Sequence, residues 1–249
     1  MSLLSALNIG ISGLQASGAS MAVVGNNIAN ANTTGFKAND AFTIALNKKT
    51  SAQSGNPAFS TTDKVMYNTY TDYSAGVLKE TNRELDLAIN GTGYFLMQGD
   101  NGIDLTRKGD FQLDTQGNIV NDKGDFLLGT KGIITVEDDT KQVVVNKSGE
   151  LYMDGEYYDT LMITELDNPN QNLNKKDNGL FELTSTQDYR WTNPNGNKVF
   201  QGYLEDSNVN PLKEMVKMIE NEKSFNLNQK VIQAIDATLN TSVNQIGKV

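Results

Sequence analysis

The chain has 249 residues, 38% of them hydrophobic, and its 21 Lys and Arg face 30 Asp and Glu, which gives a net charge of −9. It contains neither Cys nor His, so thiol catalysis, disulfides, Cys-based metal sites and the usual histidine base of hydrolases are excluded. The acidic balance argues against nucleic acid as a partner. We expect no catalytic residues, no metal site and no cofactor.

The first thirty residues carry a stripe of apolar side chains at helical spacing. Apolar residues recur every three or four positions from about residue 3 to residue 30, and Gly18 and Gly25 occupy positions of the same series. Gly10 and Gly13 lie in the same stretch, and each Gly costs a helix about 1 kcal/mol relative to Ala. The stripe, which we predict to be an assembly interface, consists of Leu4, Leu7, Ile11, Leu14, Met21 and Ile28.

Two interpretations of this segment stay open. It is an ordinary core helix whose glycines mark close crossings, or its small residues let neighbouring backbones approach in a bundle and it becomes ordered on assembly. Polar residues interrupt its apolar runs, so we expect neither a secretory signal nor the ~20 apolar residues of a membrane span. Turn-forming residues end the helix, namely Asn26, Asn27, Asn30, Asn32, Thr33, Thr34 and Gly35.

The middle of the chain is punctuated by turn signals. Residues 36–85 are polar and are predicted as an extended connector with a short helix near Ala38–Leu46. Residues 86–205 are predicted as short antiparallel strands that form a partly barrel-like sheet. The apolar strand-length runs are Tyr94–Met97, Ile133–Val136, Val143–Val145 and Leu161–Thr164. The turn signals are Asn90-Gly91, Asn101-Gly102, Asn178-Gly179, Asn195-Gly196, Asp114–Asn118 and Asp122–Asp125.

The C-terminal segment predicts a long helix. Asn210 is suited to cap it, and Pro211 suits the first turn, where its missing N–H costs nothing. Some 36 helical residues would reach ~54 Å, a length typical of a coiled-coil or bundle element. The predicted interface residues of this helix are Met215, Met218, Ile219, Phe225, Ile232, Ile235, Leu239 and Ile246.

Three pairs of carboxylates are candidates for catalytic chemistry. Asp100 with Asp104, Asp110 with Asp114, and Asp138 with Asp139 each offer a pair of the kind that glycosidases use. Each pair lies among turn formers, where Asp is common without any catalytic role. Asp100–Asp104 also resembles a calcium loop, but it lacks the Glu that completes an EF-hand. We therefore predict that the chain is not an enzyme.

Four segments carry a resemblance to a known family. Asn26–Lys37, Glu84–Phe95, Thr106–Asp114 and Gly202–Asn210 resemble, in this order, four signatures of the bacterial flagellar axial proteins, which build rod and hook. The resemblance covers both ends and the first half of the middle, and it is weaker over residues 137–200. The residues that carry it also include Phe36, Ser207, Asn208 and Val209.

This resemblance implies an α+β fold in which long N- and C-terminal helices pair in a coiled-coil-like inner domain and a β-rich, partly barrel-like domain lies outside. The corresponding domains are residues 1–35 with 208–249 as a helical inner-tube domain, 36–85 as a connector, and 86–207 as the outer domain. It also implies a structural subunit that polymerises helically around the export channel and transmits torque from motor to hook.

The resemblance further implies partners and a location. The partners are further copies of the chain, other rod and hook subunits, the flagellar export apparatus and, as additional candidates, the rings around the rod; neither nucleic acid nor membrane insertion is expected. The location is the periplasmic basal body, reached without a cleaved signal peptide. Ser207–Leu212 and Lys223–Phe225 favour the proximal rod, whereas Ile9–Leu14 and Gly25–Asn32 have a hook-like character. The distal rod or a hook-like subunit is therefore the alternative.

Two other classes of function remain as hypotheses. One is a hydrolase that acts on peptidoglycan through Asp and Glu pairs. The other is a scaffold or cap that assists assembly and is absent from the finished structure. Activity against cell wall and the protein content of purified basal bodies would separate them from a rod subunit.

Overall fold

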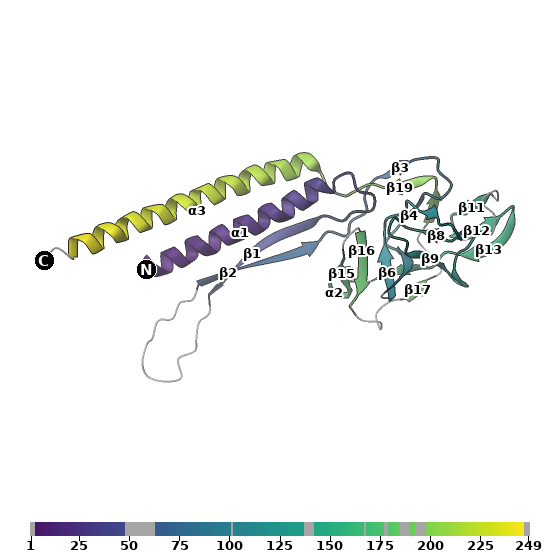
Figure 1. Cartoon of the computed structure of the whole chain (residues 1–249), viewed down its shortest axis with the longest axis horizontal. Coiled ribbons are helices and arrows are strands. Elements are labelled where there is room, and N and C mark those ends of the chain that lie inside the picture. Colours follow the sequence, from purple (N-terminus) through teal and green to yellow (C-terminus); the bar gives the residue numbers. More distant parts are fainter. Residues whose placement is uncertain are drawn as a thin grey trace, which may run out of the picture. The chain divides into compact units, whose positions relative to one another are not determined.

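The computed structural model describes residues 3–47, 63–100, 102–136, 142–166, 168–176, 179–184, 190–192 and 198–246. The chain divides into two compact units (Figure 1). Unit 1 comprises Met1–Ala29, Asn39–Tyr70 and Asn210–Val249, and unit 2 comprises Asn30–Ala38 and Thr71–Val209, so the chain passes between them four times.

Unit 1 consists of two long helices and a two-stranded sheet. Helix α1 spans Leu3–Ala29 and helix α3 spans Pro211–Ile246, which confirms both predicted helices. Strands β1 (Asn39–Asn47) and β2 (Asp63–Thr71) pair with each other. Asn210 caps α3, because its Oδ1 accepts the Lys213 N–H at 3.2 Å and its carbonyl accepts the Glu214 N–H at 3.0 Å.

The short helix predicted near Ala38–Leu46 is wrong, because β1 begins at Asn39 and runs to Asn47. Phe42, Thr43 and Ile44 form an aromatic and β-branched run, which favours a strand when a partner strand is at hand. Strand β2 supplies that partner from the far side of residues 48–62. A prediction from local sequence did not include this long-range pairing.

Unit 2 is β-rich, with one short helix, α2 (Pro169–Asn172). Within the described residues its largest sheet has ten strands and contains the order β15-β16-β6-β5-β9-β8-β7, and it forms no closed barrel. The remaining strands form the three-stranded sheet β11-β12-β13 and the pairs β18-β4 and β19-β3. The strands are β3 (Leu78–Glu80), β4 (Leu87–Asn90), β5 (Tyr94–Gly99), β6 (Gly102–Thr106), β7 (Gln112–Leu113), β8 (Ile119–Val120), β9 (Phe126–Gly129), β10 (Gly132–Ile133), β11 (Val143–Val145), β12 (Glu150–Met153), β13 (Glu156–Thr160), β14 (Ile163–Glu165), β15 (Leu173–Lys175), β16 (Leu180–Leu183), β17 (Arg190–Thr192), β18 (Lys198–Gln201) and β19 (Tyr203–Glu205).

Alternating side chains of these strands form the core of unit 2. Phe95, Met97 and Leu127 are fully buried in one cluster, in which the rings of Phe95 and Phe111 meet edge to face. A second cluster contains Tyr94, Leu96, Leu105 and Phe181 on the other face of β5. Burial of both faces of β5 explains why Tyr94–Met97 is a continuous apolar run.

Three turns of unit 2 repeat one hydrogen-bonding pattern. At Asp114–Asn118, Asn121–Asp125 and Asn146–Glu150, the first side chain accepts N–H groups two and four residues later. In each turn a side-chain amide also donates to the carboxylate at the other end. Such side-chain turns explain why Asp and Asn are frequent at these positions.

The other turn signals had mixed outcomes. Gly99 pairs with Gly102, so β5 and β6 form the predicted antiparallel hairpin. Asn90-Gly91 does not make a hairpin, because β4 pairs with β18 whereas β5 pairs with β6, β9 and β14. Asn178 and the dipeptide Asn195-Gly196 lie outside the described residues.

Candidate assembly surfaces and a buried ion-pair hub

Helices α1 and α3 pack against each other in antiparallel directions (Figure 1). Gly10 lies against Ile232 and Gly13 lies against Asn228, so a Cβ on either glycine would come within about 3 Å of the partner side chain. Closer to the C-terminal end of α1, Ser20 Oγ accepts a hydrogen bond from Asn221 Nδ2 at 2.9 Å. Two of the four glycines in α1 therefore mark a close helix crossing.

The most buried positions of α1 do not coincide with its predicted apolar stripe. The buried positions of α1 are Gly10, Ala16, Val24 and Asn27, a face of small and polar residues. At about 100° per residue, the predicted stripe is centred roughly a third of a turn away from this face. Leu7, Leu14, Met21 and Ile28 are only partly buried there, Ile11 is 42% exposed, and the side chain of Leu4 lies outside the described residues.

The predicted stripe of α3 divides into two faces. Met218, Phe225, Ile232, Ile235 and Leu239 are partly buried on one side of the helix. Met215 and Ile219 are exposed, and the side chain of Ile246 lies outside the described residues. We define the outward α3 face as the exposed apolar residues centred roughly half a turn from the buried side; it consists of Leu212, Met215, Val216, Ile219 and Leu227.

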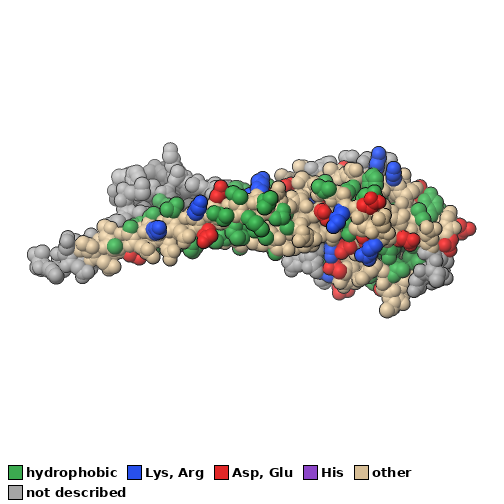
Figure 2. Space-filling view, turned by 90° about the horizontal axis from the view of Figure 1, so that it is seen from above, with side chains coloured by type: hydrophobic (Ala, Val, Ile, Leu, Met, Phe, Trp, Pro, Cys, Tyr) green, Lys and Arg blue, Asp and Glu red, His purple; other side chains and the backbone are tan. Residues whose placement is uncertain are grey.

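The outward α3 face is an unusual surface for a single chain. Leu212 is 76% exposed and Ile219 is 53% exposed. Figure 2 shows apolar side chains gathered along the helical part of the molecule. A helix that is apolar on opposite sides has two surfaces to bury, and one partner helix covers only one of them.

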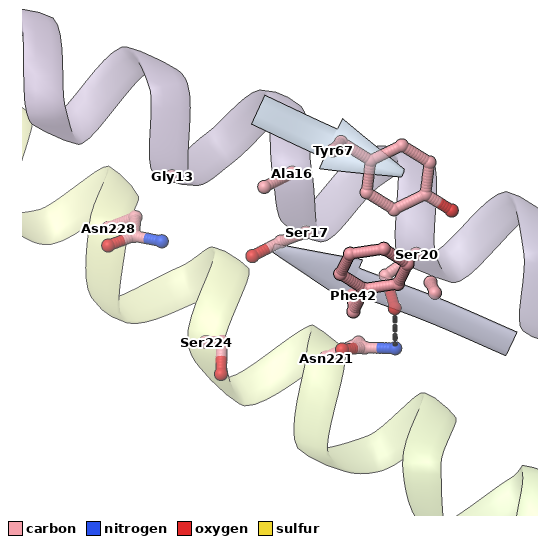
Figure 3. A pocket seen from close by; sticks show the side chains of 10 residues that line it. Gly13, Ala16, Ser17, Ser20, Phe42, Tyr67, Asn221, Ser224 and Asn228 are labelled. Atoms are coloured by element: carbon pink, nitrogen blue, oxygen red, sulfur yellow. Dashed lines mark hydrogen bonds between the residues drawn. The ribbon is translucent and has the colours of Figure 1, made fainter. Parts of the chain in front are cut away.

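An open cleft of about 620 Å³ lies within unit 1. Helix α1 contributes Gly13, Ala16, Ser17 and Ser20 to it, whereas Asn221, Ser224 and Asn228 come from α3 (Figure 3). The remaining lining residues, Ala41, Phe42 and Tyr67, belong to β1 and β2. Tyr67 also donates from its hydroxyl to the Ala19 carbonyl at 3.0 Å, which ties β2 to α1.

Asn27, one of the predicted motif residues, joins three elements of unit 1. Its carboxamide bonds the backbone of Asn39 at the start of β1 and donates to Glu214 Oε2 of α3 at 3.0 Å. Lys217 bridges the other oxygen of Glu214 at 2.7 Å and Asp40 Oδ1 at 2.6 Å. The network connects the C-terminal end of α1 to the N-terminal ends of β1 and α3.

Unit 2 contains a buried cluster of charges, which we call the ion-pair hub: Lys37, Arg107 and Glu205. Lys37 Nζ donates to Glu205 Oε1 at 2.5 Å, and Arg107 Nη1 donates to Glu205 Oε2 at 3.1 Å. Burial lowers the pKa of Lys37, and the nearby Glu205 carboxylate partly counters this effect. Arg107 also lies 5.0 Å from the centre of the Tyr94 ring, a phenol whose pKa is raised by burial.

Three of the four motif segments therefore meet in the hub. Lys37 ends the first, Arg107 belongs to the third and Glu205 to the fourth. The family resemblance pointed to these segments but not to the three charges in particular. The available signal was a charged residue within a segment of Gly and aromatic residues, as in Gly35-Phe36-Lys37.

The neighbouring motif residues surround the hub. Gly35 has φ +64° and donates its N–H to the Glu205 carbonyl at 2.7 Å. Phe36 is buried, and Lys175 Nζ lies 3.8 Å from the centre of its ring. Asn208 accepts the Ala38 N–H with Oδ1 and donates from Nδ2 to the carbonyls of Asp72 and Ser74.

The other predicted motif residues have smaller roles. Thr33 Oγ1 donates to Asn30 Oδ1 at 3.2 Å, and Thr34 Oγ1 donates weakly to Asp110 at 3.4 Å. Ser207 Oγ accepts the N–H of Val209, whose side chain is buried. Asn26 and Asn32 are exposed.

Asp104, Asp110 and Asp114, which belong to the candidate carboxylate pairs, are each engaged by a cation or by their own turn. Asp104 is held by Lys176 at 2.7 Å, and Asp110 lies 3.5 Å from Lys108. Asp114 accepts hydrogen bonds within its own turn, and these bonds, led by that from Asn118, lower its pKa. The described residues contain no group of three or more side chains suited to hold a metal ion, and Asp138 and Asp139 lie outside them.

The expectation that α1 contains no segment apolar enough to span a membrane needs correction. The segment Leu7–Ala29 is long and apolar enough to span a membrane by length and composition, although no such segment was expected. Mean hydropathy is averaged over many residues, so the Ser, Asn and Gly residues that interrupt the apolar runs do not prevent the segment from being long and apolar enough. Core helices of soluble proteins and signal sequences near an N-terminus meet the same criterion, so it is a weak indication.

Comparison with known families matches three parts of the chain. Residues 7–37 match the family "Flagella basal body rod protein", residues 88–153 match "Flagellar hook protein FlgE/F/G D1 domain", and residues 201–246 match "Flagellar basal body rod FlgEFG protein C-terminal". The first and third matches include the segments that carry Lys37 and Glu205, and the second includes Arg107.

Individual relatives match the chain almost from end to end. The flagellar basal-body rod protein FlgG of Bacillus subtilis is 30% identical over 97% of this chain and 99% of its own length. FlgG of Buchnera aphidicola subsp. Baizongia pistaciae is 30% identical over 94% and 96%. The rod protein FlgF of Caulobacter vibrioides is 29% identical over 98% of both chains. The chain therefore belongs to the family of bacterial flagellar basal-body rod proteins.

Proposed function

We propose that the chain is a structural subunit of the flagellar rod that polymerises through its two long helices. The observation that carries the proposal is the apolar surface that unit 1 leaves uncovered: the stripe of α1 centred on Ile11 and the outward α3 face. In a polymer these surfaces bury against α1 and α3 of neighbouring subunits in coiled-coil-like contacts. The predicted residues of both helices, from Leu4 to Ile28 and from Met215 to Ile246, then share the helical layer: the exposed ones, such as Ile11, Met215 and Ile219, contact neighbouring subunits, and partly buried ones, such as Ile232, pack within the subunit.

The domain roles are part of this proposal. Residues 1–35 with 208–249 form the inner tube around a central channel, 36–85 form the connector, and the β-rich residues 86–207 form the outer layer. The pairing of α1 with α3 supports the inner-tube assignment, because it brings the two ends of the chain into one unit.

We place the subunit in the proximal rod. The support for this placement is the sequence of two segments, Ser207–Leu212 and Lys223–Phe225. Overall similarity does not decide between the two parts of the rod, because the relatives named FlgF and FlgG are 29% and 30% identical to the chain. The partners are copies of this chain, other axial proteins, the export apparatus and the rings around the rod. The subunit is exported uncleaved to the periplasm, where the absence of Cys avoids mispaired disulfides.

The membrane and enzyme alternatives have less support. Gly10 and Gly13 of α1 face α3, and Asn27 bonds β1 and α3, so this helix has protein partners rather than lipid. A peptidoglycan hydrolase would need a free carboxylate pair, and Lys176 already engages Asp104. The family is one of structural flagellar proteins.

The experiment introduces charge on the outward α3 face. We expect Val216→Glu with Ile219→Glu to leave the helicity and unfolding of the purified subunit nearly unchanged, because both side chains are exposed, and to abolish motility and incorporation into basal bodies. The matched control is Gln233→Glu, an exposed polar position of the same helix. Normal rods that contain the double variant would refute the proposed interface.

A further inference from the structure

The ion-pair hub joins charges that are far apart in the sequence. Glu205 follows Lys37 by 168 residues and Arg107 by 98 residues. The Lys37 and Glu205 side chains are 0% exposed, and the Arg107 side chain is 2% exposed. Water therefore cannot compensate for a missing partner in the folded unit.

The charges of the hub are unequal in number, because two cations share one carboxylate. Their other hydrogen-bond acceptors are neutral carbonyl oxygens: Ser74 for Lys37, and Ile89 and Gly91 for Arg107. Asp72 adds only the weakest of the attractions that favour the charge on Lys37. Glu205 also fixes the connector, since Oε1 accepts the Gly76 N–H at 2.8 Å.

Removing one partner of a buried ion pair is far more costly than never burying the charges, because the remaining charge stays desolvated and uncompensated. Without Glu205, closing unit 2 would bury Lys37 and Arg107 side by side with no full counter-charge. The two cations would also repel each other, an effect that already lowers the pKa of Lys37 in the complete hub.

The two cations of the hub precede its carboxylate in the sequence. Chains are made from the N-terminus, so Lys37 and Arg107 are available long before Glu205. Glu205 lies in β19, which pairs with β3, and the preceding strand β18 pairs with β4. Strands β18 and β19, which complete these pairs, are thus synthesised together with the neutralising carboxylate of Glu205.

We propose that Glu205 is a charge lock on folding: unit 2 stays open until this residue, near its C-terminal end, neutralises Lys37 and Arg107. An incomplete chain then remains unfolded rather than closing prematurely. That the delayed closing of unit 2 serves export through a channel rests on the proposed function. The dependence of unit 2 folding on Glu205 does not rest on it. The experiment is therefore done on the purified full-length protein, away from any flagellum.

The experiment compares amide hydrogen exchange in β5 and β6 among full-length variants. Glu205→Gln represents a chain in which the carboxylate never arrives while size and shape are retained. We expect exchange to become at least roughly a hundredfold faster than in the wild type, the scale of a broken buried ion pair. Glu182→Gln, at a 54% exposed carboxylate 3.7 Å from Lys176, is the control and should change exchange less than threefold.

Two further variants separate charge from packing. Lys37→Met with Arg107→Met and Glu205→Gln removes every charge of the hub, and we expect it to recover at least tenfold of the lost protection. Lys37→Met with Glu205→Gln retains one cation and should lie between this triple variant and Glu205→Gln. The charge lock would be overturned if Glu205→Gln left the protection of β5 and β6 unchanged. It would also be overturned if the triple variant were as unprotected as Glu205→Gln and the double variant showed no gain in protection.

Discussion

The carboxamide of Asn27 bonds both backbone groups of Asn39, since Oδ1 accepts the Asn39 N–H at 3.0 Å and Nδ2 donates to its carbonyl at 2.7 Å. The side chain thus takes the place of a neighbouring strand at the point where β1 begins. Because Nδ2 also donates to Glu214, a single buried amide links α1, β1 and α3.

Replacing this amide should loosen unit 1. Asn27→Ala removes one hydrogen bond each from the Asn39 N–H, the Asn39 carbonyl and the Glu214 carboxylate, which keeps its ion pair with Lys217, and a lost buried bond costs about 1–3 kcal/mol. We expect a lower unfolding temperature and faster exchange of the first β1 amides. Asn8→Ala, at an exposed position of α1, should have no such effect, and equal behaviour of the two variants would contradict this role of Asn27.

The glycines of α1 should respond differently to substitution. A Cβ at Gly18 meets nothing within 4 Å, so Gly18→Ala should stabilise the helix by about 1 kcal/mol. At Gly10 the Cβ would lie 3.0 Å from Ile232 Cγ1, so the crowding offsets the same gain. Circular dichroism and thermal unfolding of both variants measure the difference, and a larger gain at Gly10 would contradict the observed helix crossing.

Gly35→Ala should strongly destabilise unit 2. Its φ of +64° is unfavourable for Ala, and the added Cβ would lie 2.5 Å from the backbone nitrogen of Lys108. Strain costs about 1–2 kcal/mol and the contact with rigid backbone adds more. Gly124→Ala is the matched control, because it has φ +91° but open space around the Cβ, so urea unfolding should show the strain alone.

Lys175 should make the stability of unit 2 depend on pH. Burial lowers the pKa of Lys175 to about 8 from 10.5, so between these values the unfolded chain binds more protons than the folded one. Stability contributed by this group therefore rises with pH across that window. Because part of the side chain meets solvent, we expect at most about 1 kcal/mol between pH 8 and 9.5.

The measurement is urea unfolding of the wild type and of Lys175→Met at both pH values. Their difference removes the contribution of Tyr94, whose raised pKa lowers stability only at higher pH. A pH dependence that is the same in both proteins would exclude Lys175 as its source.

Local sequence predicted the helices well because their signals are local. The periodicity of residues 3–30 and the pair Asn210-Pro211 gave the extent of α1 and the start of α3. Strand β1 was missed because its partner lies beyond residues 48–62. The pattern also showed which side chains of α1 are apolar but not which positions are buried, since the small residues Gly10 and Ala16 are buried whereas Ile11 is exposed.

The ion-pair hub could not be predicted from the sequence for a different reason. Lys37, Arg107 and Glu205 lie in separate segments, and nothing in a single sequence pairs charges so far apart. Only the order of strands, which brings β19 beside β3 and next to the end of β6, places the three side chains together.

The two-sided apolar character of α3 has a consequence for the free subunit before it is incorporated. Such a molecule is prone to associate at random, and its net charge of −9 provides the long-range repulsion that keeps copies apart in dilute solution. Ions in the medium shorten the reach of that repulsion, to about 8 Å at physiological ionic strength. Colloidal behaviour of the unassembled pool is therefore governed by salt.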